Sequence, residues 1–401
     1  MTSRQLAALC LGWLCAGLLP AHAADGGADR TEDGWLRASP QYAWSFPRDH
    51  WSHPGYRSEW WYLTGHLQAA DGRRFGYQFT FFRVGLLQEV PDLDSPWGAR
   101  DLLMGHAALT DLSSGEHHFS EVLYRAMPLL AGFPEAAAHK DAAAHKDAAA
   151  QEDADPQLLA WCLAPAGTSG RWTLHFNGDG FDLRMMDAGA GFALDLSTTA
   201  DKPLVFQGPG GFSAKAKGPD PGASQYYSFT RLRTSGHVVL GGDTLAVDGS
   251  SWMDKEFGSD KLAPRQAGWD WFSLQLADGR DIMLYVLRDA DGAIDHASGT
   301  VIDAAGGVSY LAADEFAIES TATWTSPHTG AVYPSGWTLR VGDVSLVVRP
   351  LLQDQENVGQ RVGDLFYWEG AVQVLDDDGN SHAGSGYVEL TGYGSGRRPG
   401  I

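Results

Sequence analysis

The segment Phe75-Gly76-Tyr77-Gln78-Phe79-Thr80-Phe81-Phe82 decides the fold class of this chain. Its large aromatic residues recur at every second position, and this period of two places Tyr77, Phe79 and Phe81 on one face of an extended strand. A helix would need its apolar residues at a spacing of three and four. The segment therefore predicts a β-strand with one fully apolar face.

A second segment, 281–287, is apolar on both faces, because Ile282 and Leu284 alternate with Met283 and Tyr285. Strands of this kind are typical of a closed barrel or a sandwich. Turn sequences that contain Asp-Gly or Asn-Gly separate such segments. We find no long amphipathic helix and no alternation of strands with helices, so the sequence predicts an all-β protein. The turn sequences lie at 70–73, 177–180, 277–280, 291–292 and 378–380.

A faint internal repeat indicates two domains. The aromatic segment 60–62 leads through a turn at 71–73 to a strand ending at Arg83, and the segment 270–272 leads through a turn at 278–280 to a strand ending at Arg288. Chance similarity between two hairpins is the alternative. Interpreted as a duplication, the repeat predicts two antiparallel β-barrel domains, with a linker at 218–222. The expected domains are 41–220 and 221–401.

The composition of the 401 residues excludes several classes of function. Fifty acidic residues oppose 29 basic ones, which gives a formal net charge of −21. Nucleic acids and anionic membrane surfaces would be repelled by such a protein. With 44% hydrophobic and 11% aromatic residues, the chain as a whole is not disordered.

The N-terminus indicates export. Arg4 precedes the apolar run 6–19, and Ala21-His22-Ala23 is an A-x-A cleavage pattern. The run is shorter than the roughly 20 residues that cross a bilayer as a helix. We expect residues 1–23 to be a signal peptide, residues 24–40 to be flexible and the product to be secreted or periplasmic; a buried N-terminal helix is the alternative.

The mature chain would keep one cysteine, Cys162, which rules out an internal disulfide and any metal site built from cysteines. Cys162 lies in the expected strand 158–163, where a buried, inert thiol is the usual outcome. The low-complexity stretch 136–155 reads as an inserted loop. The histidines show no ligand spacing, and the standard nucleophile, phosphate-binding and zinc motifs are missing. We therefore expect neither a metal nor a cofactor.

The first dense aromatic cluster surrounds one carboxylate. Glu59, Trp60, Trp61 and Tyr62 are consecutive, and rings of this kind stack on flat apolar ligands. We expect all four to bind substrate, and burial among the rings would raise the pKa of Glu59. The alternative is that Glu59 pairs with a nearby arginine, Arg57 or Arg48, and that the rings are plain core.

The second cluster contains three acids. Asp254 and Glu256 alternate in the segment 251–259, and Asp270 lies between Trp269 and Trp271. A neutral carboxyl beside indole rings suits protonation of an unactivated double bond, because the rings stabilise the resulting cation. The alternative is a structural salt bridge from Asp254 or Glu256 to one of three bases, Lys255, Lys261 or Arg265.

These clusters also carry a family resemblance. The segments 46–83, 252–258, 268–288, 366–370 and 386–393 resemble the secreted AttH-like proteins, in the superfamily of carotenoid 1,2-hydratases, or hydroxyneurosporene synthases. Five motifs over roughly 40–395 make the resemblance specific to this family. It implies two lipocalin-like barrels and an apolar isoprenoid- or lipid-like ligand. Relatives have been labelled predicted secreted hydrolases, and some are encoded beside ABC transporter permeases.

Together, these observations predict a secreted protein that acts on an extended apolar molecule by acid-assisted hydration or hydrolysis. Asp254 or Asp270 would be the general acid, with Glu256 nearby, and Trp269, Trp271 and Tyr285 would form the wall around the cation. The alternative is a periplasmic carrier that delivers a lipophilic ligand to an ABC transporter. A buried carboxyl that faces an aromatic cavity without a basic partner would favour the enzyme.

Overall fold

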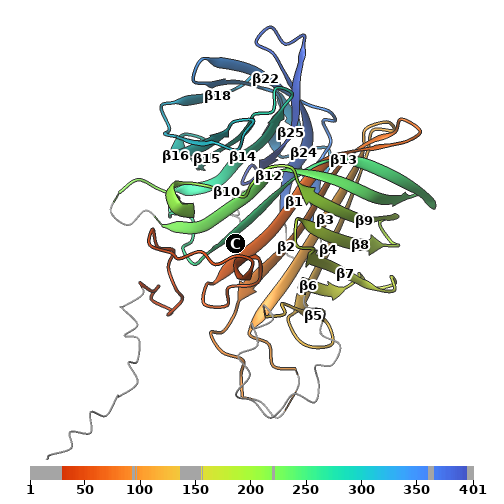
Figure 1. Ribbon diagram of the computed structural model, residues 1–401, viewed down its shortest axis with the longest axis vertical. Coiled ribbons are helices and arrows are strands. Elements are labelled where there is room, and N and C mark those ends of the chain that lie inside the picture. Colours follow the sequence, from red (N-terminus) through yellow and green to blue (C-terminus); the bar gives the residue numbers. More distant parts are fainter. Residues whose placement is uncertain are drawn as a thin grey trace, which may run out of the picture.

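The computed structural model shows a two-part β-protein (Figure 1). The expected signal peptide 1–23, the expected insert 136–155 except Asp155, and the middle of the expected linker lie outside the described residues. No described helix is long and apolar enough to cross a membrane. The structure describes residues 29–92, 95, 97–135, 155, 157–218, 222–359 and 365–394.

The first part is a large antiparallel sheet that curls into a nearly closed barrel. Among the described residues its main path runs β4-β3-β2-β1-β13-β12-β9-β8-β7-β6-β5, and the short strands β10 and β11 pair with β12. Two 3-10 helices, η1 (Arg48–His50) and η2 (Pro209–Gly211), lie in its connections. The strands are β1 (Ser58–Ala69), β2 (Arg74–Gly85), β3 (Asp101–Asp111), β4 (Glu116–Arg125), β5 (Ala131–Gly132), β6 (Leu158–Leu163), β7 (Arg171–Phe176), β8 (Phe181–Asp187), β9 (Phe192–Ala200), β10 (Val205–Phe206), β11 (Phe212–Ala214), β12 (Ala223–Leu240) and β13 (Asp243–Gly258).

The second part is a smaller antiparallel sheet with the path β17-β16-β15-β14-β25-β24-β22-β21-β18. In the described chain, β23 pairs with β24 beside this path, and β19 and β20 form a separate ribbon. The strands are β14 (Gln266–Leu276), β15 (Asp281–Asp289), β16 (Ile294–Ile302), β17 (Val308–Leu311), β18 (Phe316–Ser320), β19 (Thr323–Thr325), β20 (Val332–Pro334), β21 (Trp337–Val341), β22 (Val344–Pro350), β23 (Glu356–Val358), β24 (Phe366–Leu375) and β25 (His382–Leu390).

The two tryptophan-rich hairpins occupy equivalent positions in the two sheets. β1 lies between β2 and β13, the last strand of the first sheet, and β14 lies between β15 and β25, the last strand of the second. Each hairpin turn contains a glycine at positive φ, Gly72 at +90° and Gly279 at +91°, a conformation that favours glycine. The topology therefore confirms the repeat and the expected all-β, lipocalin-like architecture.

The boundary between the two sheets differs from the expected position near residue 220. β12 and β13 follow that position in the chain, yet both belong to the first sheet. β13 is needed there because it pairs with β1 along the whole strand, from Ser58 opposite Gly258 to Ala69 opposite Val247. The first sheet consequently ends at Gly258, and the second begins at Gln266.

Strands that are apolar on both faces contribute one face to the core of their own sheet and the other face to the contact between the two sheets. On β2, Tyr77, Phe79 and Phe81 are fully buried in the first core, as the period of two predicts. On β15, Ile282 belongs to the second core, whereas Tyr285 belongs to a third apolar cluster built from both sheets. The second apolar face thus packs against the other sheet.

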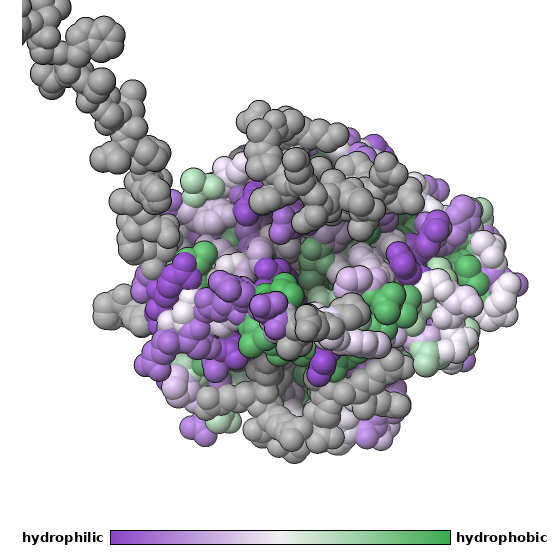
Figure 2. Space-filling model, turned by 90° about the horizontal axis from the view of Figure 1, so that it is seen from below, coloured by the Kyte–Doolittle hydropathy of each residue, from purple (hydrophilic) through white to green (hydrophobic). Residues whose placement is uncertain are grey.

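The lower end of the molecule in Figure 1 is not uniformly polar. Figure 2 views it from below and shows hydrophobic residues near its centre, among hydrophilic ones. The connection between β2 and β3 exposes Leu86, Leu87, Val90 and Trp97. This end of the molecule therefore exposes apolar as well as polar side chains.

Candidate functional site

A cavity of about 150 Å³ lies between the two sheets, on the faces opposite their cores. Strands of both sheets line it, and the connections that follow β11 and β13 complete its rim. Its wall is made mostly of aromatic rings and carboxyl groups. These are Trp60, Tyr62, Phe82, Tyr226, Trp269, Trp271, Tyr285 and Tyr367 among the rings, and Asp254, Glu256, Asp260, Glu369 and Glu389 among the acids.

Asp254 is the acid at the centre of this wall. Its side chain is buried, and its two oxygens accept hydrogen bonds from Tyr226 Oη (2.6 Å), Ser228 Oγ (2.5 Å) and Trp252 Nε1 (2.6 Å). No ion pair joins it to a base in the described part of the chain. Burial raises the pKa of Asp254 to about 7, although the hydrogen bonds oppose this shift.

A chain of hydrogen bonds connects Asp254 to the other sheet. Trp271 Nε1 on β14 donates to Tyr226 Oη at 3.1 Å, and Tyr226 donates in turn to Asp254. Because both sheets contribute to this chain, the position of the carboxyl depends on the contact between them.

Two further acids, Glu369 on β24 and Glu389 on β25, are direct cross-strand neighbours. Burial raises the pKa of Glu369 well above its ordinary range, and Glu389 adds to the shift. Burial likewise raises the pKa of Glu389 to about 7, while a hydrogen bond from Trp269 Nε1 (3.1 Å) opposes it. The cavity therefore holds three carboxyl groups whose charged forms are less favourable than they would be in water.

Glu256 differs from these three because it has a cationic partner. Lys215 Nζ lies 2.6 Å from Glu256 Oε1, and Ser224 Oγ also donates to that carboxylate. The expected partners Lys255, Lys261 and Arg265 are not the ones observed. Glu256 is thus held as part of an ion pair at the cavity wall.

Glu59 and Trp61 do not reach the cavity, which corrects two of the expected binding residues. Side chains alternate along β1, so Trp60 and Tyr62 face the cavity while Glu59 and Trp61 face the interior of the first barrel. Trp61 is fully buried in the first core. The expected raised pKa of Glu59 is also wrong, because basic neighbours hold it well below its ordinary range.

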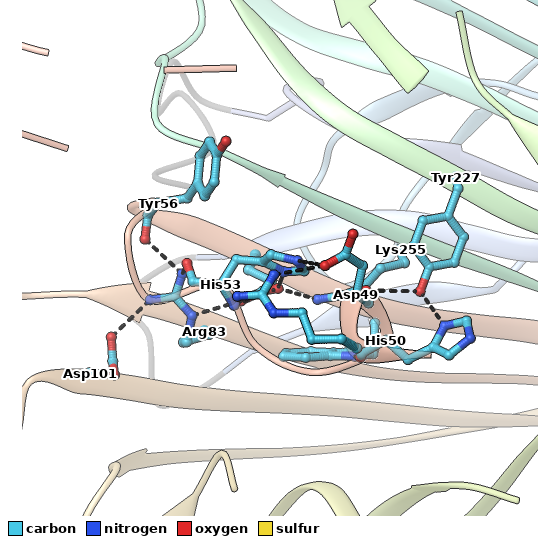
Figure 3. A network of polar contacts seen from close by, with 11 residues as sticks. Asp49, His50, His53, Tyr56, Arg83, Asp101, Tyr227 and Lys255 are labelled. Carbon is cyan, nitrogen blue, oxygen red and sulfur yellow. Dashed lines mark hydrogen bonds and ion pairs between the residues drawn. The ribbon is translucent and has the colours of Figure 1, made fainter. Parts of the chain in front are cut away.

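The partners of Glu59 form a buried network on that inner face (Figure 3). Arg83 Nε donates to Glu59 at 2.8 Å, His53 Nδ1 lies 2.6 Å from it, and Lys255 Nζ contacts it directly. The ammonium of Lys255 lies 3.4 Å from the ring centroid of Trp61. The arginine partner is therefore Arg83, whose position opposite Glu59 is set by the pairing of β1 with β2.

Asp270 also points away from the cavity, toward the interior of the second sheet. Its carboxylate accepts hydrogen bonds from Arg288 Nε at 2.8 Å and from Tyr393 Oη at 2.9 Å. Burial raises its pKa, and Arg288 opposes this effect. Asp270 and Arg288 thus correspond to Glu59 and Arg83 in the first sheet, so the equivalent acids of the repeat are Glu59 and Asp270.

Of the ten expected site residues, the structure brings seven together in the cavity wall and leaves Glu59, Trp61 and Asp270 outside it. Sequence reasoning missed Glu369, Glu389, Tyr226 and Lys215. Glu369 and Glu389 were visible in the segments 366–370 and 386–393, where each alternates with apolar neighbours. Lys215 is the first of two lysines, with Lys217, in a polar connection, and it gave no signal of its own.

The arrangement can hold an apolar group beside weakly acidic carboxyls. A neutral carboxyl can donate a proton at neutral pH, and indole and phenol rings attract a developing positive charge. Within the described ranges, no group of three or more His, Cys, Asp or Glu residues is arranged to hold a metal ion.

Comparisons with known proteins agree with this architecture. A crystal structure of a protein from Nitrosomonas europaea that is described as an AttH candidate is 31% identical and superposes with a TM-score of 0.73, over 90% of this chain and 100% of that one. Kievitone hydratase from Nectria haematococca has the same fold at 15% identity, with a TM-score of 0.60 over 88% of this chain and 95% of that one. A comparison with curated proteins gave no match. Since the AttH-like family model matches residues 37–393, nearly the whole described chain, this protein belongs to the AttH-like family.

Proposed function

We propose that the protein is a cofactor-free enzyme that adds water to a carbon–carbon double bond of an apolar substrate. The observation that carries this proposal is the position of Asp254, a buried carboxyl with a pKa near 7 that faces an aromatic cavity without a basic partner in the described chain. A pKa near the working pH is what a general acid needs.

The reaction would proceed in two proton transfers. Asp254 in its neutral form donates its proton to one alkene carbon, and the positive charge that develops on the other carbon lies among the rings of Trp271 and Tyr226. Water then bonds to that carbon. The proton that the added water loses returns to the Asp254 carboxylate, so the protein ends as it began.

The size of the cavity limits the part of the substrate that it can enclose. A volume of about 150 Å³ accommodates a group the size of one benzene ring. We therefore propose that an extended isoprenoid-like molecule inserts one end and leaves the rest outside. Hydrolysis of a compact apolar compound by the same acid is the variant reaction.

The alternative function is a carrier that delivers a lipophilic ligand to an ABC transporter. Carrier and enzyme both need an apolar cavity, but only an enzyme needs an acid that is neutral and unpaired. Asp254 has a pKa near 7 and no ion pair with a base in the described chain, whereas Asp270 is tied to Arg288. The enzyme is for this reason the better supported proposal.

The test is incubation with acyclic isoprenoid alkenes in ¹⁸O-labelled water, followed by mass spectrometry of the products. We expect the wild-type protein to produce alcohols that carry the label and Asp254→Asn to produce none, while both retain the alkene in a binding assay. Label incorporation by the variant at the wild-type rate would refute the role of Asp254. Mass spectrometry of lipophilic molecules that co-purify with the protein identifies the substrate.

A further inference from the structure

One end of the cavity already holds an ammonium group. Lys215 Nζ contacts the carboxylate of Glu256 and lies 4.9 Å from the ring centroid of Tyr285 and 5.7 Å from that of Tyr226. A carboxylate with aromatic faces is a favourable environment for an ammonium, because both attract its charge. At this end, the chain itself supplies both the carboxylate and its cation.

The other end has the same components without a cation. Glu369 and Glu389 are direct neighbours on β24 and β25, and Trp271 on β14 lies opposite Glu389. Glu369 is 2% exposed, and the nearby Tyr62 phenol opposes the rise in its pKa. Neither oxygen of Glu369 has a hydrogen-bond partner of good geometry among the described residues. The rings of Tyr62 and Tyr367 complete this part of the wall.

We infer that the carboxyl pair Glu369 and Glu389 binds an organic cation, a substituted ammonium group. The buried carboxyls supply the opposite charge, and the surrounding rings supply aromatic faces. No ion pair connects either acid to a base within the described chain, so the ligand would be their only cation. A compact ammonium such as a trimethylammonium group suits a cavity of about 150 Å³.

Binding of a cation should displace protons from this pair. Burial and repulsion from neighbouring carboxylates keep the pair partly protonated at neutral pH, and a nearby positive charge favours the ionised form. The charged groups on the neighbouring elements are Asp254 and Glu256 on β13 and Lys215, with Asp260 and Lys261 at the rim. The phenols of Tyr62, Tyr226 and Tyr367 remain neutral, because burial raises their pKa values well above the ordinary range.

This inference deepens the proposed function and rests on the same cavity. In the hydration reaction, the alkene carbon that becomes positively charged after protonation would occupy the position of the ammonium. The two claims can nevertheless fail separately. Turnover with labelled water tests the acid Asp254, whereas equilibrium binding of an ammonium tests the pair Glu369 and Glu389.

The experiment compares choline with 3,3-dimethylbutan-1-ol by isothermal titration calorimetry. The two probes have the same shape, since a carbon replaces the charged nitrogen in the alcohol. We expect choline to bind about tenfold more tightly or better, because cation–π attraction and charge pairing act only on the ammonium. Equal binding of the two probes, or no binding of choline, would overturn the inference.

The pH dependence gives a second measurement on the unaltered protein. Since the pair must lose protons to pair with the ligand, choline affinity should rise between pH 6 and 8, and heats measured in buffers of different ionisation enthalpy should report proton release. The neutral alcohol should show neither effect. Choline binding without proton release would exclude the pair as its site.

Two variants locate the site. Glu369→Gln and Glu389→Gln keep the shape of the side chains, and each should reduce the preference for choline to within about twofold of the alcohol. Glu319→Gln is the matched control, because it removes one acidic charge from an exposed position on β18. If both cavity variants bind choline as the wild type does, the ammonium site lies elsewhere and the inference is wrong.

Discussion

Asp254→Asn should make the protein more stable at neutral pH. The pKa of Asp254 is about 7 in the folded protein, against an ordinary value of 3.8. An acid with a raised folded-state pKa binds more protons in the folded than in the unfolded state, so stability falls as the pH rises from about 4 to about 7. Asparagine has the shape of the neutral acid and does not ionise.

The size of the effect follows from the difference between the two pKa values. One pKa unit corresponds to about 1.4 kcal/mol, so the ionisable side chain should cost about 4 kcal/mol of stability above pH 7 and almost none at pH 4. The hydrogen bonds from Ser228 and Trp252 can still be accepted by the asparagine carbonyl oxygen. The stability that Asp254→Asn loses with its polar contacts should therefore be smaller than the stability that it gains by not ionising.

Urea denaturation at several pH values between 4 and 8 measures this effect. The difference in unfolding free energy between Asp254→Asn and the wild type should grow with pH and level off above about pH 7. The control Glu319→Gln, at an exposed position, should run parallel to the wild type. A difference between Asp254→Asn and the wild type that stays constant across this range would refute the raised pKa and, with it, the reason for naming Asp254 as the acid.

Three further predictions concern the buried ions, the thiol and the N-terminus. Glu59→Gln should lower the free energy of unfolding by about 3–5 kcal/mol, because Lys255 and Arg83 are both 0% exposed and would lose the carboxylate that they share. Asp270→Asn leaves only one arginine without its partner, so it should lower the free energy of unfolding by less. Equal losses in urea denaturation would contradict this ranking. Burial raises the pKa of the Cys162 thiol, so a thiol reagent should label it only after unfolding; rapid labelling of the native protein would show that the thiol is accessible. The exported protein should begin at or near Ala24, and N-terminal sequencing of periplasmic material that returns Met1 would contradict the proposed signal peptide.

The amino-acid sequence alone determined the strands and the relations between neighbouring side chains on them. The period of two at 75–82 identified the core face of β2, and the segment 281–287 showed that β15 is apolar on both faces. Alternation also placed Asp270 opposite to Trp269 and Trp271. These features are local, because the pleat of a strand orients each side chain relative to the next one.

The tertiary structure alone decided which of the two faces meets the cavity. Glu59 and Asp270 turned inward to Arg83 and Arg288, because the pairing of each hairpin brings an arginine close to the acid. The period of two in a sequence shows which residues share a face of a strand, but it does not show what that face contacts. The sheet boundary at Gly258 escaped prediction for the same reason, since it depends on the pairing of β13 with β1.

Glu369 and Glu389 were recognisable in the sequence only as members of family motifs. They reach the cavity because β25 pairs with β14 and β24 pairs with β25, which carries both acids to the face that packs against the first sheet. Their unusual pKa values arise from burial and from repulsion by neighbouring carboxylates, which depend on distances between segments far apart in the chain. A sequence lists the ionisable groups, but only the folded chain sets the solvent and the neighbours that determine their charge.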